Sequence, residues 1–156
     1  MLKVDEFKAV IQATPLISID FIVKNNKDEI LLGKRINRPA KGSWFVPGGR
    51  VLKDEQFEQA FHRLIKTELN LDKAESAFKG IYQHFYDDNF SGDNFSTHYV
   101  VLAYEIKLDS TDLLLPKEQH SIYKWLTKEE LLNDETVHLH SKWYFQDNKQ
   151  ADRLFR

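Results

Sequence analysis

One carboxylate in the chain is predicted to lie on the apolar, core-facing side of a helix. Apolar residues spaced three and four apart predict a helix over Glu55–Leu69 with one side facing the core. The expected core-facing residues are Phe57, Ala60, Phe61, Leu64 and Ile65. Glu68 falls within that apolar stripe and in the last turn, where burial and the helix dipole both disfavour an anion. A bound metal ion would offset both costs, unless the helix ends before Glu68 and the carboxylate reaches water.

A second carboxylate, Asp20, interrupts an apolar segment. Residues 16–23 are rich in β-branched side chains, and a strand there places Asp20 on the opposite face from Ile19 and Phe21. A sheet covered on both faces should not hold an unpaired charge at that position, so Asp20 is a candidate site residue. The alternative is an edge strand whose outer face meets water.

Two arginines flank a glycine turn that precedes the helix. Arg35 follows the predicted strand Glu29–Lys34, and Arg50 follows Gly48 and Gly49. Guanidinium groups offer paired donors that match phosphate oxygens. We therefore expect these arginines to bind phosphate, the alternative being solvated arginines at strand ends.

The elements that must position these residues are short strands around one strong helix. Strands are predicted at residues 16–23, Glu29–Lys34, Phe78–Phe85, Thr97–Ile106 and Ile122–Leu126, and helices at residues 4–12, Glu55–Leu69, Lys128–Leu132 and Ser141–Asn148. No linker or repeat divides the chain, so we expect one domain over residues 1–156. This order predicts an α/β (α+β) class, with a mixed β-sheet sandwiched between helices as α/β/α layers.

Composition narrows the classes of function. The 156 residues are 42% hydrophobic and include no cysteine, which excludes disulfides and leaves oxygen or imidazole ligands for any metal. A formal charge of −2 provides no cationic field for nucleic acid. The N-terminus lacks a signal-peptide pattern, and no apolar run approaches the roughly 18 residues of a membrane span. We expect a cytoplasmic protein that binds neither nucleic acid nor membrane.

The glycine turn and the helix together carry a family resemblance. The Nudix pattern is a Gly, five residues, a Glu, seven residues, then Arg-Glu-apolar-any-Glu-Glu-any-Gly-apolar. The matching residues are Gly49, Glu55, Arg63, Ile65, Glu68 and Leu71. The chain departs from the pattern at Leu64 and Thr67, where the family has glutamates, and at Asn70, where it has glycine. These departures, and segments over nearly the whole chain, resemble one branch of the family, the GDP-mannose mannosyl hydrolases.

The resemblance implies the Nudix fold and one Mg²⁺ per subunit, with Mn²⁺ as an alternative metal. The implied ligands are the Gly48 carbonyl, the Glu68 carboxylate and the Gln119 side-chain oxygen, all hard donors of the kind Mg²⁺ prefers. Two family carboxylates are missing, so a single ion is the expected complement. Without the resemblance, Gln119 would be interpreted as a surface loop residue. The loss of two carboxylates from the helix is also compatible with an inactive protein that only binds its ligand.

His120 is the residue expected to act as general base. Attack of water on a sugar carbon requires removal of a proton, and imidazole titrates near neutral pH. A lone histidine between strands is more often a surface residue, but the resemblance reverses that order. The catalytic set implied by the resemblance is His120, Asp20, Arg35, Arg50 and Tyr99.

The resemblance also implies a set of substrate contacts and a homodimer. The implied substrate-binding residues are Leu2, Phe7, Asp20, Arg35, Arg50, His84 and Tyr99. Leu2 and Phe7 match positions near the guanine base in relatives, where the contact can cross a dimer interface. His84 and Tyr99 lie in predicted strands and could instead be half-buried sheet residues. Residues 86–95 form an aromatic and acidic loop that shapes specificity or the dimer, or is a solvated hairpin tip.

Three functions remain in view. The favoured one is Mg²⁺-dependent hydrolysis of GDP-mannose or GDP-glucose at the sugar C1, which gives GDP and free hexose with inversion. The second is cleavage of a nucleotide sugar at phosphorus, which the missing carboxylates at Leu64 and Thr67 disfavour. The third is a nucleotide-sugar sensor without catalysis, which the joint presence of Glu68, Gln119 and His120 disfavours.

Overall fold

The central feature of the fold is one mixed β-sheet, seen in a computed structural model that describes residues 2–109, 113–116 and 120–152, with the backbone alone at residues 120 and 121. The strands within this part of the chain are β1 (Leu16–Lys24), β2 (Ile30–Arg35), β3 (Trp44–Phe45), β4 (Gly48–Arg50), β5 (Ser76–Tyr86), β6 (Thr97–Lys107) and β7 (His120–Leu126). Their order is β3-β2-β1-β6-β5, with β4 paired to β1 and β7 paired to β2. Only the β1–β6 pair is parallel among these described pairs. The mixed sheet predicted from the sequence is confirmed.

Strand β1 lies in the middle of the sheet and directs alternate side chains to two cores. Ile19, Phe21 and Val23 pack with helix α2 (Phe57–Leu69), whereas Ile22 packs on the opposite face. Asp20 shares the face of Ile22, as the alternation predicted, and a central strand excludes the edge-strand alternative.

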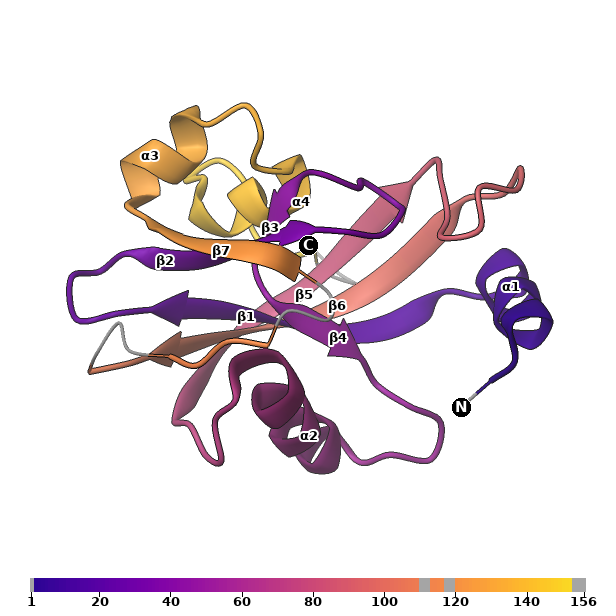
Figure 1. The fold of residues 1–156 in the computed structure, drawn as a ribbon, viewed down its shortest axis with the longest axis horizontal. Coiled ribbons are helices and arrows are strands. Elements are labelled where there is room, and N and C mark those ends of the chain that lie inside the picture. Colours follow the sequence, from indigo (N-terminus) through magenta and orange to yellow (C-terminus); the bar gives the residue numbers. More distant parts are fainter. Residues whose placement is uncertain (1, 110–112, 117–119, 153–156) are drawn as a thin grey trace.

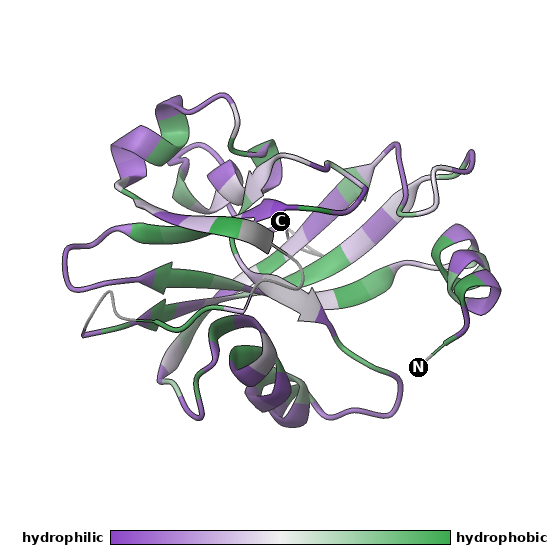
Figure 2. Cartoon of the chain, in the orientation of Figure 1, coloured by the Kyte–Doolittle hydropathy of each residue, from purple (hydrophilic) through white to green (hydrophobic). Residues whose placement is uncertain are grey.

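Helices cover both faces of the sheet. Helix α2 lies on one face, and α3 (Lys128–Asn133), α4 (Leu139–Lys142) and the 3₁₀ helix η1 (Trp143–Phe145) lie on the other (Figure 1). Helix α1 (Val4–Ala13) stands beside the sheet near the β5–β6 end. Figure 2 shows hydrophobic residues on the central strands and hydrophilic residues on the outer side of α2. The predicted α/β/α arrangement is confirmed.

Helix α2 differs in part from its prediction. It begins at Phe57 instead of Glu55, because Gln56 caps it and the Gln59 side chain accepts a hydrogen bond from the Gln56 backbone N–H. Phe57 is 56% exposed, so its predicted core position is wrong: it is the first residue of the helix, and burial starts one turn later at Ala60. The helix continues through Leu69, and Glu68 is 5% exposed, which excludes the frayed-helix alternative.

The C-terminal helix and two short strands also differ from the prediction. The predicted helix Ser141–Asn148 is instead the short α4 followed by η1, which ends at Phe145. Strands β3 and β4 were not predicted, since two or three residues are too few to show a period of two. Among the helices that the structure describes, none combines the length and apolar character needed to cross a bilayer.

Candidate active site

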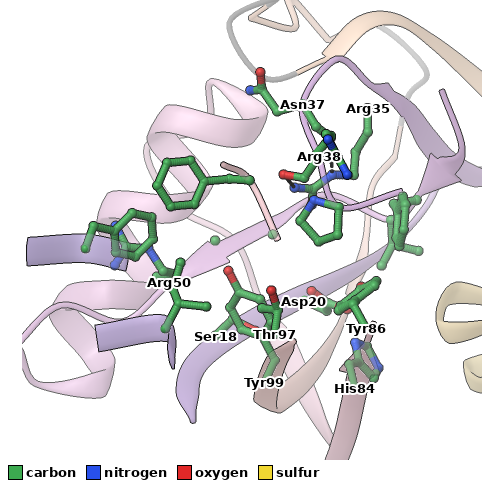
Figure 3. A pocket seen from close by; sticks show the side chains of 18 residues that line it. Ser18, Asp20, Arg35, Asn37, Arg38, Arg50, His84, Tyr86, Thr97 and Tyr99 are labelled. Carbon is green, nitrogen blue, oxygen red and sulfur yellow. Dashed lines mark hydrogen bonds between the residues drawn. The ribbon is translucent and has the colours of Figure 1, made fainter. Parts of the chain in front are cut away.

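Most of the predicted site residues meet in one pocket of about 490 Å³. The pocket opens between α1, the turn between β2 and β3, the glycine turn at β4 and the paired ends of β1, β5 and β6 (Figure 3). Its lining includes seven predicted residues, namely Phe7, Asp20, Arg35, Gly48, Arg50, His84 and Tyr99. The fold therefore brings together residues that lie up to 92 positions apart, from Phe7 to Tyr99.

Asp20 is held by a residue that the sequence did not single out. The Tyr144 hydroxyl donates a hydrogen bond of 2.5 Å to the Asp20 Oδ2, from η1 on the same side of the sheet. Burial raises the pKa of Asp20 to about 7, while this hydrogen bond and the nearby Arg35 guanidinium pull it down. The charged form of Asp20 is thus weakly disfavoured at neutral pH, and positive charge bound in the pocket would stabilise it.

The two expected phosphate-binding arginines are both ordered by aromatic rings. The Arg50 Cζ lies 4.1 Å from the centre of the Phe7 ring, and the Arg35 Cζ lies 5.6 Å from the centre of the Phe45 ring. Arg35 also donates from Nε to the Asn37 carbonyl at 3.2 Å. Held in this way, the guanidinium groups lose little side-chain entropy when an anion binds between them.

Arg63 and Glu55 support the backbone of Arg50. Arg63 donates to both carboxylate oxygens of Glu55 at 2.7 and 3.0 Å, and from Nη2 to the Arg50 carbonyl at 2.8 Å. The pKa of Glu55 is lowered by this hydrogen bond from Arg63. Two residues of the spacing pattern therefore fix the glycine turn, and neither lies in the pocket lining.

The glycine turn is pressed between β1 and α2. A Cβ on Gly48 would lie 2.4 Å from the Ile19 carbonyl oxygen and 2.6 Å from the Asp20 Oδ1, and a Cβ on Gly49 would lie 2.4 Å from the Leu64 Cδ2. The approach to the Ile19 backbone requires glycine at position 48, whereas a side chain at position 49 would require the Leu64 side chain to shift. Leu64 is 2% exposed and packs in the core between α2 and the sheet, where the family pattern has a glutamate.

The described residues include two of the three predicted metal ligands. They contain no group of three or more histidine, aspartate, glutamate or cysteine side chains arranged to hold an ion. The two ligands are the Gly48 carbonyl, which lines the pocket, and the buried Glu68 carboxylate, which is not among the lining residues; both are hard oxygen donors. Mg²⁺ commonly takes one or two carboxylates and completes its octahedron with water and substrate phosphates. The third predicted ligand, Gln119, lies outside the described residues.

His84 stands at the edge of a histidine cluster under the pocket. It is 4% exposed, its ring stacks on His140 at 4.3 Å between centroids, and the His140 ring lies 4.5 Å from that of His138. Burial lowers the pKa of both His84 and His140 to about 3, and the neighbouring histidines add to this effect. Within the described residues the His140 Nδ1 has no hydrogen-bond partner. These rings are therefore neutral at physiological pH, which suits a hydrogen-bonding contact better than a cationic one.

Tyr99 and its neighbour Tyr86 line the pocket from the β5–β6 hairpin. Their ring centroids are 6.5 Å apart with an edge-to-face geometry. Burial raises the pKa of both hydroxyls, so each remains a hydrogen-bond donor at neutral pH. Tyr99 thus has the position and protonation expected of a substrate contact.

Leu2 and His120 are placed less directly. Leu2 is 53% exposed and is not among the residues that line the pocket. His120 begins β7, and its Cα pairs with that of Arg35 on β2, which brings its backbone beside a pocket residue. The roles of Leu2 and His120 remain predictions.

Residues that sequence reasoning missed come from the C-terminal elements. Tyr144, His140 and His138 do not line the pocket themselves but contact the lining residues Asp20, His84 and Tyr86, and they come from segments with no recognisable motif. Tyr144 follows Asp20 by 124 positions, and nothing in the local sequence signals that contact. An unexplained cluster of aromatic and histidine residues at 138–145 was the available hint.

Comparison with known proteins gives the site its context. The NUDIX domain family model matches residues 14–146. The chain is 38% identical over 120 residues to the low-salt glycan biosynthesis protein Agl8 of Haloferax volcanii, covering 77% of this chain and 76% of that protein. It is 42% identical over 69 residues to the ADP-ribose pyrophosphatase of Methanocaldococcus jannaschii, covering 44% and 40%. The MutT protein structure from Methanosarcina mazei Go1 superposes with a TM-score of 0.68 at 22% identity, covering 85% and 92%, and this shows the shared fold.

Proposed function

This chain belongs to the NUDIX family, and we propose that it hydrolyses GDP-mannose, and also GDP-glucose, to GDP and free hexose by attack of water at the sugar C1. The observation that carries the proposal is Leu64, which is buried against Gly49 where the family pattern has a carboxylate. Cleavage at phosphorus, which depends on several divalent ions around a diphosphate, would need that carboxylate. A similar sugar-processing setting is suggested by the name of the Agl8 relative.

The arginines provide charge for the leaving group. GDP is a weak base, so its departure requires positive charge around the diphosphate more than a proton. Arg35 and Arg50 line the pocket with their guanidinium groups already ordered on aromatic rings. When bound by Glu68, Gly48 and Gln119, Mg²⁺ or Mn²⁺ would supply further charge to the same diphosphate oxygens.

The remaining residues handle the sugar and the attacking water. We assign His120 the role of general base, which removes a proton from the water. Asp20 lies across the pocket from Arg35 (Figure 3), where its carboxylate can accept hydrogen bonds from sugar hydroxyls and stabilise positive charge at C1. His84 and Tyr99 offer neutral hydrogen-bonding groups to the same ligand. One displacement without a covalent intermediate inverts the anomeric configuration.

Cleavage at phosphorus is the second candidate function. The ADP-ribose pyrophosphatase relative, 42% identical over 69 residues, favours it. The products would then be a nucleoside monophosphate and a sugar phosphate. The missing carboxylate at Leu64 argues against this candidate, since fewer divalent ions would then surround the diphosphate.

The position of bond cleavage can be read directly from the oxygen isotope. We would incubate the protein with GDP-mannose and Mg²⁺ in ¹⁸O-labelled water and determine product masses. Label in free mannose beside unlabelled GDP supports attack at carbon. Label in GMP or in mannose 1-phosphate contradicts the proposal and supports cleavage at phosphorus, and bound ligand without products contradicts both.

The base assignment has its own test. His120→Gln should lower kcat by about 100-fold or more, because general base catalysis commonly contributes that much. The Mg²⁺ concentration for half-maximal activity should stay within about twofold, since His120 is not a proposed ligand. A variant with the wild-type kcat would remove His120 from this role. Homodimerisation, inferred from the resemblance, stays a prediction that light scattering can test.

A further inference from the structure

The loop 87–96 between β5 and β6 lies over the edge of the pocket and touches two other segments there. The Arg38 guanidinium, from the turn between β2 and β3, donates to both Asp88 carboxylate oxygens at 2.6 and 2.8 Å. Lys8 of α1 forms an ion pair with Asp93. Phe90 lines the pocket and is the aromatic residue that the loop contributes to it.

The loop is also fixed from within. The Asn89 side chain is fully buried and donates to the carbonyls of Asp93 at 2.6 Å and Phe95 at 2.7 Å. Its Oδ1 accepts a hydrogen bond from the Ser91 backbone at 2.9 Å. These bonds tie together the backbone on both sides of Phe90, whose ring packs on Phe7. The sequence left open whether this loop is a solvated hairpin tip, and these contacts argue against that alternative.

The neighbouring Phe7 ring has two close partners. The Arg50 guanidinium lies 4.1 Å from its centre, and the Phe90 ring stacks on it with centroids 5.0 Å apart and planes at 28°. The Phe7 ring therefore links the Arg50 guanidinium to the Phe90 ring. Within the described residues Phe90 has its only ring contact with Phe7, and Phe90 also lines the pocket, where a ligand can reach it.

The order of groups along this edge matches the order of groups in a nucleoside diphosphate. Arg50 comes first, then Phe7, then Phe90, in steps of 4.1 and 5.0 Å. A diphosphate held by Arg50 and Arg35, as in the proposed function, has its nucleoside next to it, and the planar apolar part of that nucleoside is the base. Phe90 offers an aromatic face in the same pocket and at that end of the row.

We propose that Phe90 is the residue on which the nucleobase of the substrate stacks, and that the Arg38–Asp88 pair holds it in place. The inference rests on the proposed function for the position of the diphosphate. Phe7, the predicted contact near the base, lines the same pocket and packs against both Arg50 and Phe90. The ligand class is a purine or pyrimidine nucleoside diphosphate, and stacking by itself tolerates any base.

The test compares two probes, GDP and inorganic pyrophosphate, by calorimetry in the presence of Mg²⁺. Phe90→Leu should weaken GDP binding by about 5- to 100-fold, the usual effect of removing one aromatic stacking partner of a base. It should leave pyrophosphate affinity within about twofold, because pyrophosphate has no base. Phe90→Trp keeps an aromatic face and should retain GDP affinity. The matched control is Phe85→Leu, in the same hairpin, since Phe85 is 60% exposed, stacks on His98 and does not line the pocket.

Three outcomes would overturn the inference. If wild type binds GDP and Phe90→Leu binds it equally well, Phe90 does not stack on the base, and the proposed function is unaffected. If Phe90→Leu weakens GDP and pyrophosphate alike, Phe90 acts only by supporting Arg50 through Phe7. If wild type binds neither probe, the proposed function fails and the inference fails with it. Circular dichroism of each variant, matched to wild type, confirms that the loss is not one of folding.

Discussion

Replacing Asp20 with Asn should make the protein more stable at alkaline pH while removing activity. Asp20 sits on the central strand β1 and faces the pocket. Asparagine carries no charge at any pH, and its side-chain oxygen can still accept the hydrogen bond from the Tyr144 hydroxyl. The substitution therefore removes a charge without disturbing the packing around it.

The size of the effect follows from the pKa of Asp20. Burial raises it from the ordinary value of 3.8 to about 7 in the folded protein, so the folded state holds a proton that the unfolded chain releases. The stability due to this group is fully present below pH 3.8 and is lost as pH rises through 7. At about 1.4 kcal/mol for each tenfold change in proton affinity, the loss approaches about 4 kcal/mol. Because the side chain is only half-buried, that value is an upper bound, and we expect about 2 to 4 kcal/mol.

The assay is urea unfolding of wild type and Asp20→Asn between pH 4 and pH 8.5, followed by tryptophan fluorescence. Divalent cations and nucleotides are left out, since positive charge near Asp20 would lower its pKa. His84 and His140, whose pKa values burial lowers to about 3, give wild type an opposite trend with pH. That trend is present in both proteins and cancels in the difference of their unfolding free energies.

Two results would refute this reasoning. A stability difference that stays constant from pH 4 to pH 8.5 would mean that Asp20 titrates in the folded protein as it does in the unfolded chain. An Asp20→Asn variant less stable than wild type at pH 8 would mean that the carboxylate makes contacts worth more than its burial costs. The expected result is equality near pH 4 and a stability gain that grows above it.

Two further predictions concern other buried ionisable groups. Glu68→Gln should raise the Mg²⁺ concentration for half-maximal activity by roughly tenfold or more, because it removes the charge of a predicted ligand that is 5% exposed; an unchanged Mg²⁺ titration would make Glu68 a packing residue. The stability of His140→Phe relative to wild type should rise as pH falls from 7 to 3. The pKa of His140 is lowered from 6.5 to about 3 in the folded protein, so below pH 6.5 a proton binds His140 in the unfolded chain first, and wild type loses stability. Unfolding curves at pH 4 and pH 8 check this, and equal differences at both would contradict it.

The sequence predicted the layers of the fold because each strong element carries its own periodic pattern. In β1, the alternation of Ile19, Phe21 and Val23 against Asp20 and Ile22 sorted the two faces correctly. In α2, helical spacing placed Glu68 in the buried stripe, which the structure confirms. Elements without a period were missed: β3 and β4 are held by pairing with β2 and β1, a long-range cause that a window of a few residues does not contain.

The site was predictable where its residues belong to a motif and unpredictable where they meet only through the fold. Arg35, Gly48 and Arg50 stand beside the glycine turn, and all three line the pocket. Tyr144 reaches Asp20 from η1, an element predicted as a longer helix, so its hydroxyl had no expected partner. Asn70 illustrates a smaller case: it replaces the family glycine at the end of α2 and adopts φ 56°, a left-handed conformation that asparagine tolerates better than other non-glycine residues.

The departures from the family pattern change how the pocket can balance charge. Leu64 packs in the core next to Gly49, so leucine at this position adds apolar contacts. The glutamate of the family pattern would instead provide a carboxylate that could hold a cation. With fewer metal ligands, more of the charge on a departing diphosphate must be met by protein groups that are already in position. The ion pair of Arg63 with Glu55 fixes the Arg50 backbone, and the Phe7 ring orders its guanidinium. A pocket with few carboxylate ligands and ordered arginines is suited to stabilising a leaving group, and this is why we place the reacting bond at the sugar carbon.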